Sequence, residues 1–170
     1  AQSILKKIGS SCDALECGAH WPLDSGELRA LAARREEPTV LHNNCSGKHC
    51  GFLAVAAVRG LAVAGYTDVS HPVMREVTKA ISLMTGVELR NQQACIDGCA
   101  IPAFSIPLVS IAAGFARLGT GEGLSPVLAR AAERIRTAVV QNPIMLSGAG
   151  RIDTLITVSY THLRAHETSK

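Results

Sequence analysis

The sequence predicts an α+β fold in which helices dominate and strands are few. Apolar residues recur at helical spacing in several segments, most clearly at Val73, Val77, Ile81 and Met84, which fall on one helical face. The composition is 47% hydrophobic but only 4% aromatic, which is typical of an ordinary globular protein. Glycine or proline follows several of the periodic segments, as expected where helices end.

Most of the expected elements carry a capping residue or a stop signal. The predicted helices are residues 4–8 (stop Gly9), 25–35 (cap Asp24 or Ser25, stop Pro38), 51–58 (stop Gly60), 72–85 (opened by His71 and Pro72, stop Gly86), 106–118, 125–140 (cap Ser125) and one capped by Asp153. The other expected elements are a short strand within residues 88–96, a turn at Asp97-Gly98 and a loop over residues 146–150.

The length of 170 residues allows one sizeable core. We therefore expect one partial domain over residues 1–157. Residues 158–170 are polar and show neither the helical nor the strand period, which predicts a non-native or disordered tail with no assigned function.

Composition and charge argue against several classes of function. The formal net charge is +3, and the one basic cluster, Arg34-Arg35, is followed directly by Glu36-Glu37, which is typical of a solvated face and not of a nucleic-acid surface. No apolar run approaches the roughly 20 residues of a membrane span. No secretory signal pattern opens the sequence, so we expect a cytoplasmic protein whose six cysteines are reduced.

The most informative segment is H-N-N-C-S-G-K-H-C-G at residues 42–51, just before a predicted buried helix. The first turn of a helix exposes unpaired N–H groups and a partial positive charge, which favours the thiolate form of Cys45 that binds metals. A second segment, C-I-D-G-C at residues 95–99, places two thiols and a carboxylate around a tight turn. If the two segments meet, their thiolates, amine and imidazoles suit zinc, which takes sulfur and nitrogen ligands.

The cysteine spacings do not match a structural zinc module, so each thiol is judged by its neighbours. We expect buried packing for Cys12 and Cys50, either packing or function for Cys17 and Cys95, and function for Cys45 and Cys99, which lie beside polar turn residues.

Two further interpretations remain open. The chain could be a small zinc-binding or thiol-redox domain that uses Cys95 with Cys99, or Cys45 with Cys50, as a reversible pair. It could also be a plain helical scaffold with buried cysteines. His20 lies in a loop where it could bind a ligand, although a hydrogen bond to the backbone is the commoner role. The loop that ends at Arg151 could approach a ligand, but entry into the next helix accounts for it without one. His71 is expected to cap its helix.

Several motifs together resemble one enzyme family. H-N-N-C-S-G-K-H at residues 42–49, I-D-G-C-x-I-P at residues 96–102 and G-R-I-D-T at residues 150–154 closely resemble the second asparaginase class of bacteria, the Rhizobium etli type. The segments before residue 21, together with the pairs Gly65-Tyr66 and His71-Pro72, also match. The resemblance runs from about Gln2 to Ile156 and covers nearly the whole sequence.

The resemblance implies an enzyme that hydrolyses L-asparagine to L-aspartate and ammonia. It implies a helix-dominated α+β fragment of a serine β-lactamase/glutaminase-like fold, and a homodimer in the full-length protein. It also implies a zinc ion held by Cys45, Lys48 and Cys99, with His49 and Asp97 in the substrate site. Lysine binds zinc only as the neutral amine, so the metal would have to displace its proton.

The resemblance also implies a missing part. Serine–lysine pairs do the nucleophilic work in this class, and their matches would lie before Ala1 and beyond the C-terminus of this sequence. A serine needs an activating base to attack an amide. We therefore expect this chain to be a fragment that lacks activity alone.

Overall fold

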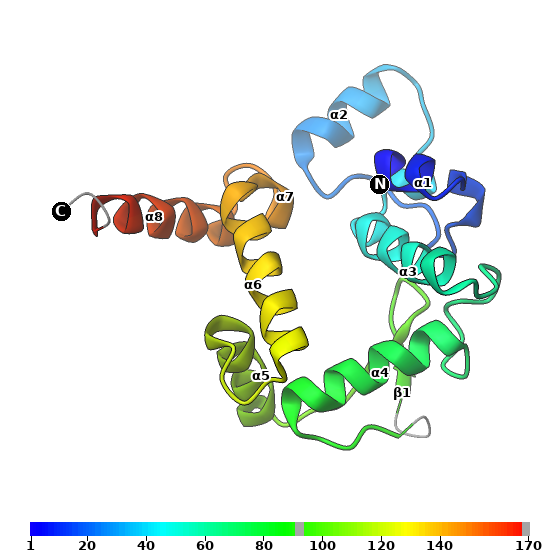
Figure 1. Cartoon of the computed structure of the whole chain (residues 1–170). Coiled ribbons are helices and arrows are strands. Elements are labelled where there is room, and N and C mark those ends of the chain that lie inside the picture. The colour runs from blue at the N-terminus through cyan, green and yellow to red at the C-terminus, as the bar shows by residue number, and fades with distance from the viewer. Residues whose placement is uncertain (91–93, 168–170) are drawn as a thin grey trace. The chain divides into compact units, whose positions relative to one another are not determined.

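The computed structural model describes residues 1–90 and 94–167, with side chains described up to Ser159. Helices dominate, and the described residues contain two short strands, which confirms the prediction of a helix-rich α+β fold (Figure 1). The chain divides into two compact units, the first comprising Ala1–Leu83 with Val87–Ile106 and the second Met84–Gly86 with Pro107–Lys170.

Among its described residues, the first unit contains four α-helices, two single-turn 3-10 helices and one hairpin. The helices are α1 (Gln2–Lys7), η1 (Cys12–Ala14), α2 (Ser25–Ala33), η2 (Val40–His42), α3 (Ser46–Arg59) and α4 (Pro72–Thr85), and the strands are β1 (Ala94–Ile96) and β2 (Pro102–Phe104). Asp24 caps α2 by accepting hydrogen bonds from the backbone N–H groups of Gly26 and Glu27. Gly60 ends α3 with a φ of 64°, a conformation that glycine adopts without strain.

Helix α3 lies at the centre of the first unit. Its buried residues Cys50 and Leu53 pack into one apolar cluster whose other buried members are Leu5, Leu15, Cys17, Tyr66 and Cys99. A second cluster joins Ala56 of α3 to Val73 and Met74 of α4. Because α3 contributes to both clusters, its N-terminal turn is held firmly against the rest of the unit.

The hairpin brings the second cysteine segment to a defined position. Strands β1 and β2 pair antiparallel, with Ala94 opposite Phe104 and Ile96 opposite Pro102. The predicted turn at Asp97-Gly98 is confirmed, and it is closed by a hydrogen bond of 2.8 Å from the Ala100 N–H to the Asp97 carbonyl. Strand β2 was not expected, because a three-residue strand that begins with proline gives almost no periodic signal.

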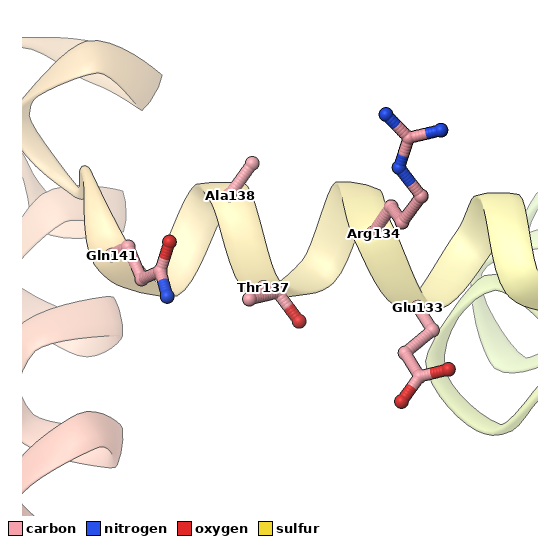
Figure 2. Close-up of a pocket in the computed structure, with 5 residues that line it drawn as sticks. All are labelled: Glu133, Arg134, Thr137, Ala138 and Gln141. Atoms are coloured by element: carbon pink, nitrogen blue, oxygen red, sulfur yellow. The ribbon is translucent and has the colours of Figure 1, made fainter.

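The second unit consists of helices around short connections. They are α5 (Leu108–Thr120), α6 (Pro126–Gln141), α7 (Ile144–Ser147) and α8 (Ile152–Glu167). Arg136 of α6 donates a hydrogen bond of 2.6 Å to the Leu118 carbonyl of α5, and Thr154 of α8 donates one of 2.7 Å to the Gly148 carbonyl. A shallow depression of about 360 Å³ lies along α6 (Figure 2). All of its lining residues belong to this one helix, so it offers no opposing wall to a ligand.

Several expectations differ from the structure. Helix α3 begins at Ser46, five residues before the expected Gly51, because the polar residues of the motif occupy its first turn. The expected loop at residues 146–150 overlaps the short helix α7. Asp153 lies in the first turn of α8 and does not precede it. Cys12 is exposed on a surface 3-10 helix, so the prediction of a buried packing role for it was wrong.

The expected tail also differs in its first part. Helix α8 continues through residues 158–167, whereas no period was recognised there. Residues 168–170 of the tail and residues 91–93 of the expected strand lie outside the described residues. The domain boundary at residue 157 stays a prediction. Within the described part of the chain, no helix has both the length and the hydrophobicity that a bilayer crossing requires.

Candidate metal and substrate site

The first half of the candidate site is built at the N-terminus of α3. Cys45 is the residue before the helix, and its N–H donates a hydrogen bond of 2.8 Å to Asn43 Oδ1. The Asn43 amide in turn donates to the carbonyls of Cys17 and Gly18, at 2.7 and 3.1 Å. Asn43 is only 5% exposed, so this buried side chain ties the 17–18 loop to the turn that carries Cys45.

The second half comes from the hairpin turn. Cys99 is buried, and its thiol donates a hydrogen bond of 3.2 Å to Asp97 Oδ2. The other carboxylate oxygen of Asp97 accepts the Gly98 N–H at 2.7 Å, which fixes the orientation of the carboxylate. One donor atom each from Cys45, Asp97 and Cys99 lies within 4.8 Å of the other two. The two segments therefore meet, as the sequence analysis required.

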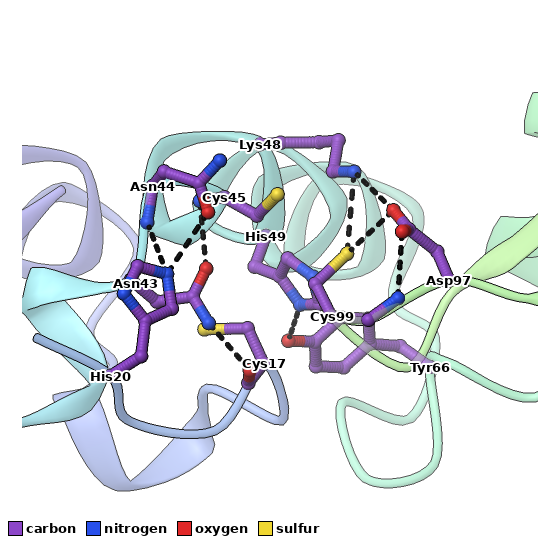
Figure 3. A network of polar contacts seen from close by, with 11 residues as sticks. Cys17, His20, Asn43, Asn44, Cys45, Lys48, His49, Tyr66, Asp97 and Cys99 are labelled. Atoms are coloured by element: carbon purple, nitrogen blue, oxygen red, sulfur yellow. Dashed lines mark hydrogen bonds and ion pairs between the residues drawn. The ribbon is translucent and has the colours of Figure 1, made fainter. Parts of the chain in front are cut away.

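Lys48 completes this group from the first turn of α3. Its Nζ donates a hydrogen bond of 3.4 Å to Cys99 Sγ and lies 3.7 Å from Asp97 Oδ2 (Figure 3). We call Cys45, Lys48, Asp97 and Cys99 the thiol–amine cluster. Lys48 and Asp97 are 39% and 46% exposed at their side chains, whereas Cys99 is 4% exposed, so the cluster has one open side and one buried side.

In this cluster the pKa values of Lys48 and Cys99 are raised, whereas that of Asp97 is lowered. Burial alone would lower the pKa of Lys48, but its hydrogen bond to Cys99 and the nearby Cys45, Cys99 and Asp97 groups outweigh burial and raise it. Burial raises the pKa of the Cys99 thiol, and its hydrogen bond to Asp97 raises it further. The same thiol, followed by the Gly98 N–H, holds the pKa of Asp97 below its usual range. The cluster without metal thus holds an ammonium and a thiol beside a carboxylate.

The donor set fits zinc. Two thiolates, an amine and a carboxylate are all groups that zinc accepts, and two sulfurs on a tetrahedral zinc lie roughly 3.8 Å apart at Zn–S distances of about 2.3 Å. The sulfur separation here is at most 4.8 Å, so small movements of the side chains would suffice. A zinc ion held by Cys99 and Lys48 would require both groups to lose their protons, which the metal's charge would favour.

His49, like Asp97, was predicted to contact substrate, but its side chain lies in the protein interior. Its ring is fully buried, and its Nδ1 lies 2.6 Å from the Tyr66 hydroxyl. Burial lowers the pKa of His49, and the neighbouring Lys48 lowers it further, which keeps the imidazole neutral. His49 Nε2 has no hydrogen-bond partner among the described residues.

Three further residues were considered from the sequence, namely His20, His71 and Arg151, and the two histidines have structural roles. His20 Nδ1 lies 2.7 Å from the Trp21 carbonyl and Nε2 accepts the Asn44 N–H at 3.2 Å, so His20 supports the turn just before Cys45. Its bond to the Trp21 carbonyl raises the pKa of His20. His71 Nδ1 accepts the Val73 N–H and confirms the predicted cap. Arg151, in the second unit, is exposed.

The other cysteines lie outside the cluster's donor group. All six are free thiols. Cys50 is fully buried, which confirms its packing role, and Cys17 is buried beside it in the same apolar cluster. Burial raises the pKa of both of these thiols, so they stay protonated. Cys95 is exposed on β1, and neither thiol pair expected for the redox interpretation is bonded.

Sequence reasoning overlooked three residues that shape the site. Asn43 was noted only as a letter of the motif, although polar side chains that orient a candidate metal ligand through hydrogen bonds are common. Glu16 and Tyr66 appeared only within matched segments. No local pattern marks them, because their partners lie 49 to 51 positions away in the chain or, for Tyr66 and His49, 17 positions away.

One comparison with known proteins decides the family. The family model described as L-asparaginase II matches residues 1–164. The chain belongs to the L-asparaginase II family. A search of curated proteins gave no match. Membership in the L-asparaginase II family indicates a hydrolase of amide bonds that acts on a small-molecule substrate, and it agrees with the helix-rich α+β architecture.

Proposed function

We propose that this chain is the metal-binding part of an L-asparagine amidohydrolase, which converts L-asparagine and water to L-aspartate and ammonia. Cys45, Lys48 and Cys99 would bind zinc. The observation that carries the proposal is the meeting of two motifs in one cluster, with Lys48 Nζ 3.4 Å from Cys99 Sγ although 51 positions separate them. Family membership supports the reaction type.

The other members of the site are assigned by their contacts. Asp97 holds both Lys48 and Cys99, so it organises the ligands on the open side of the cluster, where a polar amino acid can approach. His49 supplies a neutral imidazole from the buried side. When bound, zinc supplies a concentrated positive charge that attracts and orients a carboxylate or carbonyl oxygen of the substrate.

With Cys45 and Cys99 assigned to zinc, the chemical step takes its nucleophile from elsewhere in the proposed reaction. In the proposed reaction a serine hydroxyl attacks the side-chain amide carbonyl of asparagine. The proton of the hydroxyl passes to the amide nitrogen, which leaves as ammonia. Water then hydrolyses the acyl-serine ester, which releases aspartate and regenerates the serine. Ser46 follows Cys45, but it is 8% exposed and its hydroxyl donates to the Leu41 carbonyl at 3.3 Å. Following the family resemblance, we place the reacting serine and its lysine outside these 170 residues, in the serine β-lactamase/glutaminase-like fold that the resemblance implies. We propose a cytoplasmic homodimer for the complete enzyme.

Ammonia release from L-asparagine tests the proposal. The 170-residue chain is expected to release none, whereas the product of the complete gene is expected to release ammonia and aspartate in equal amounts. Turnover by the purified 170-residue chain would overturn the assignment of the nucleophile to outside sequence. Failure of the complete, zinc-loaded protein to hydrolyse asparagine would overturn the proposed function itself.

A further inference from the structure

The buried pair of Tyr66 and His49 has a geometry that specifies where the protons lie. Both side chains are fully buried. The Tyr66 hydroxyl lies 2.6 Å from His49 Nδ1, and its oxygen accepts the backbone N–H of Glu16 at 2.9 Å. The hydroxyl is therefore held between one donor and one ring nitrogen.

Glu16 also holds the backbone on both sides of Tyr66. Its Oε1 accepts the Gly65 N–H at 2.6 Å, and its Oε2 accepts the Thr67 hydroxyl at 2.7 Å. The rings of His49 and Tyr66 pack edge to face with centroids 5.5 Å apart. One residue thus anchors Tyr66 through its neighbours and through its hydroxyl, so the phenol has little freedom to reorient.

These contacts select one tautomer of His49. Burial raises the pKa of Tyr66 to about 12, so the phenol keeps its proton. Each tautomer leaves one buried donor without a partner among the described residues, but a hydrogen on Nδ1 would leave both the phenol proton and the bare Nε2 unpaired, so the lower cost is for the phenol to donate to Nδ1. His49 Nδ1 is the ring nitrogen in contact, and it can accept only if it carries no hydrogen. The single N–H of the neutral ring is then on Nε2, the atom without a partner among the described residues.

We propose that Tyr66 is a positioning residue that fixes His49 as the Nε2–H tautomer and so presents one unpaired N–H to a hydrogen-bond acceptor of the substrate. The acceptor class is a carboxylate or amide oxygen. Nε2 is shielded from solvent in the structure without substrate, so the acceptor can reach it only when side chains around the ring move. The substrate-facing role rests on the proposed function, whereas the tautomer assignment does not.

Nitrogen-15 NMR of the histidine-labelled 170-residue chain tests the tautomer directly. The His49 signals are assigned by their loss in His49→Gln. We expect an unprotonated Nδ1 and a hydrogen on Nε2 that exchanges slowly with water because the ring is buried. A hydrogen on Nδ1 would overturn the proposal. This measurement needs no altered Tyr66.

Tyr66→Phe then tests the cause. Removal of the hydroxyl should give a mixture of His49 tautomers while zinc stoichiometry stays unchanged. Ser70→Ala, which removes a hydroxyl bonded to Asp68 in the same loop, should leave the His49 spectrum unchanged. A Tyr66→Phe spectrum identical to that of the parent chain would refute the positioning role.

The zinc-loaded product of the complete gene tests the substrate-facing part. L-Asparagine should shift the His49 Nε2–H resonance, and Tyr66→Phe should weaken asparagine binding about tenfold, the effect of one misplaced hydrogen bond. If asparagine binds without moving that resonance, the substrate-facing role is wrong although the proposed function stands. If the tautomer is as expected but no asparagine is hydrolysed, the proposed function fails and the tautomer assignment stands.

Discussion

Replacement of Asn43 by alanine tests how the turn that carries Cys45, the candidate metal ligand, is held. Asn43→Ala removes three hydrogen bonds, two donated to the carbonyls of Cys17 and Gly18 and one accepted from the Cys45 N–H. Each contributes about 0.5–1.5 kcal/mol net, and the buried groups left unpaired add to the cost. We therefore expect the free energy of unfolding to fall by about 2–4 kcal/mol.

The same replacement should also weaken metal binding, because the Cys45 N–H is no longer fixed. Loss of a residue that orients a metal ligand typically costs about 10- to 100-fold in metal affinity. Urea unfolding of the metal-free chain measures the stability, and competition with a chromophoric chelator measures zinc affinity. The two readouts separate a loosened fold from a misplaced ligand.

Asn44→Ala is the matched control. Asn44 is the next residue and of the same type, but its side chain is exposed and contacts only His20 Nε2 in the described structure. Its replacement should change the free energy of unfolding by no more than about 0.5 kcal/mol. If Asn43→Ala is no more destabilising than Asn44→Ala, the reasoning that Asn43 anchors the site is refuted.

Two further predictions follow from proton and thiol positions. Zinc affinity should rise with pH, because the raised pKa values of Lys48 and Cys99 mean that both groups keep their protons to higher pH and must release them to bind metal; a pH-independent affinity in chelator competition would contradict this. In the metal-free native chain, a thiol reagent should label Cys12 and Cys95 at once and the buried Cys50 and Cys99 only after unfolding, and zinc should protect the half-buried Cys45. A disulfide that persists with or without chelator would instead favour the thiol-redox interpretation.

Much of the helical architecture was predictable because its signals are local. Asp24 and Ser125 cap the N-termini of α2 and α6 through their side chains, and Gly60 ends α3 in a left-handed conformation, as these residue types predict. Helix α4 has the clearest apolar periodicity, and its bounds match the expected 72–85. Strand β2 and the early start of α3 could not be predicted in the same way. The first depends on pairing with β1, and the second places polar site residues in a first helical turn.

Some residues of the candidate site could likewise be predicted from local sequence, and others could not. The residue types of the two motifs suggested a metal cluster, and the family resemblance implied Cys45, Lys48 and Cys99 as its ligands; the structure brings these residues together with Asp97. The Tyr66–His49 pair could not be found, because contact between residues 17 positions apart in different elements is a property of packing. The exposure of Cys12 was also misjudged, since a buried preference for cysteine says nothing about a particular surface turn.

Zinc stoichiometry of single cysteine variants tests the central claim most directly. The purified chain should bind one zinc ion, and Cys45→Ala or Cys99→Ala should abolish stoichiometric binding. Cys12→Ala and Cys95→Ala, which remove exposed thiols outside the cluster, should each retain it. Unchanged zinc content in Cys45→Ala and Cys99→Ala would contradict the assignment of the thiol–amine cluster as the metal site.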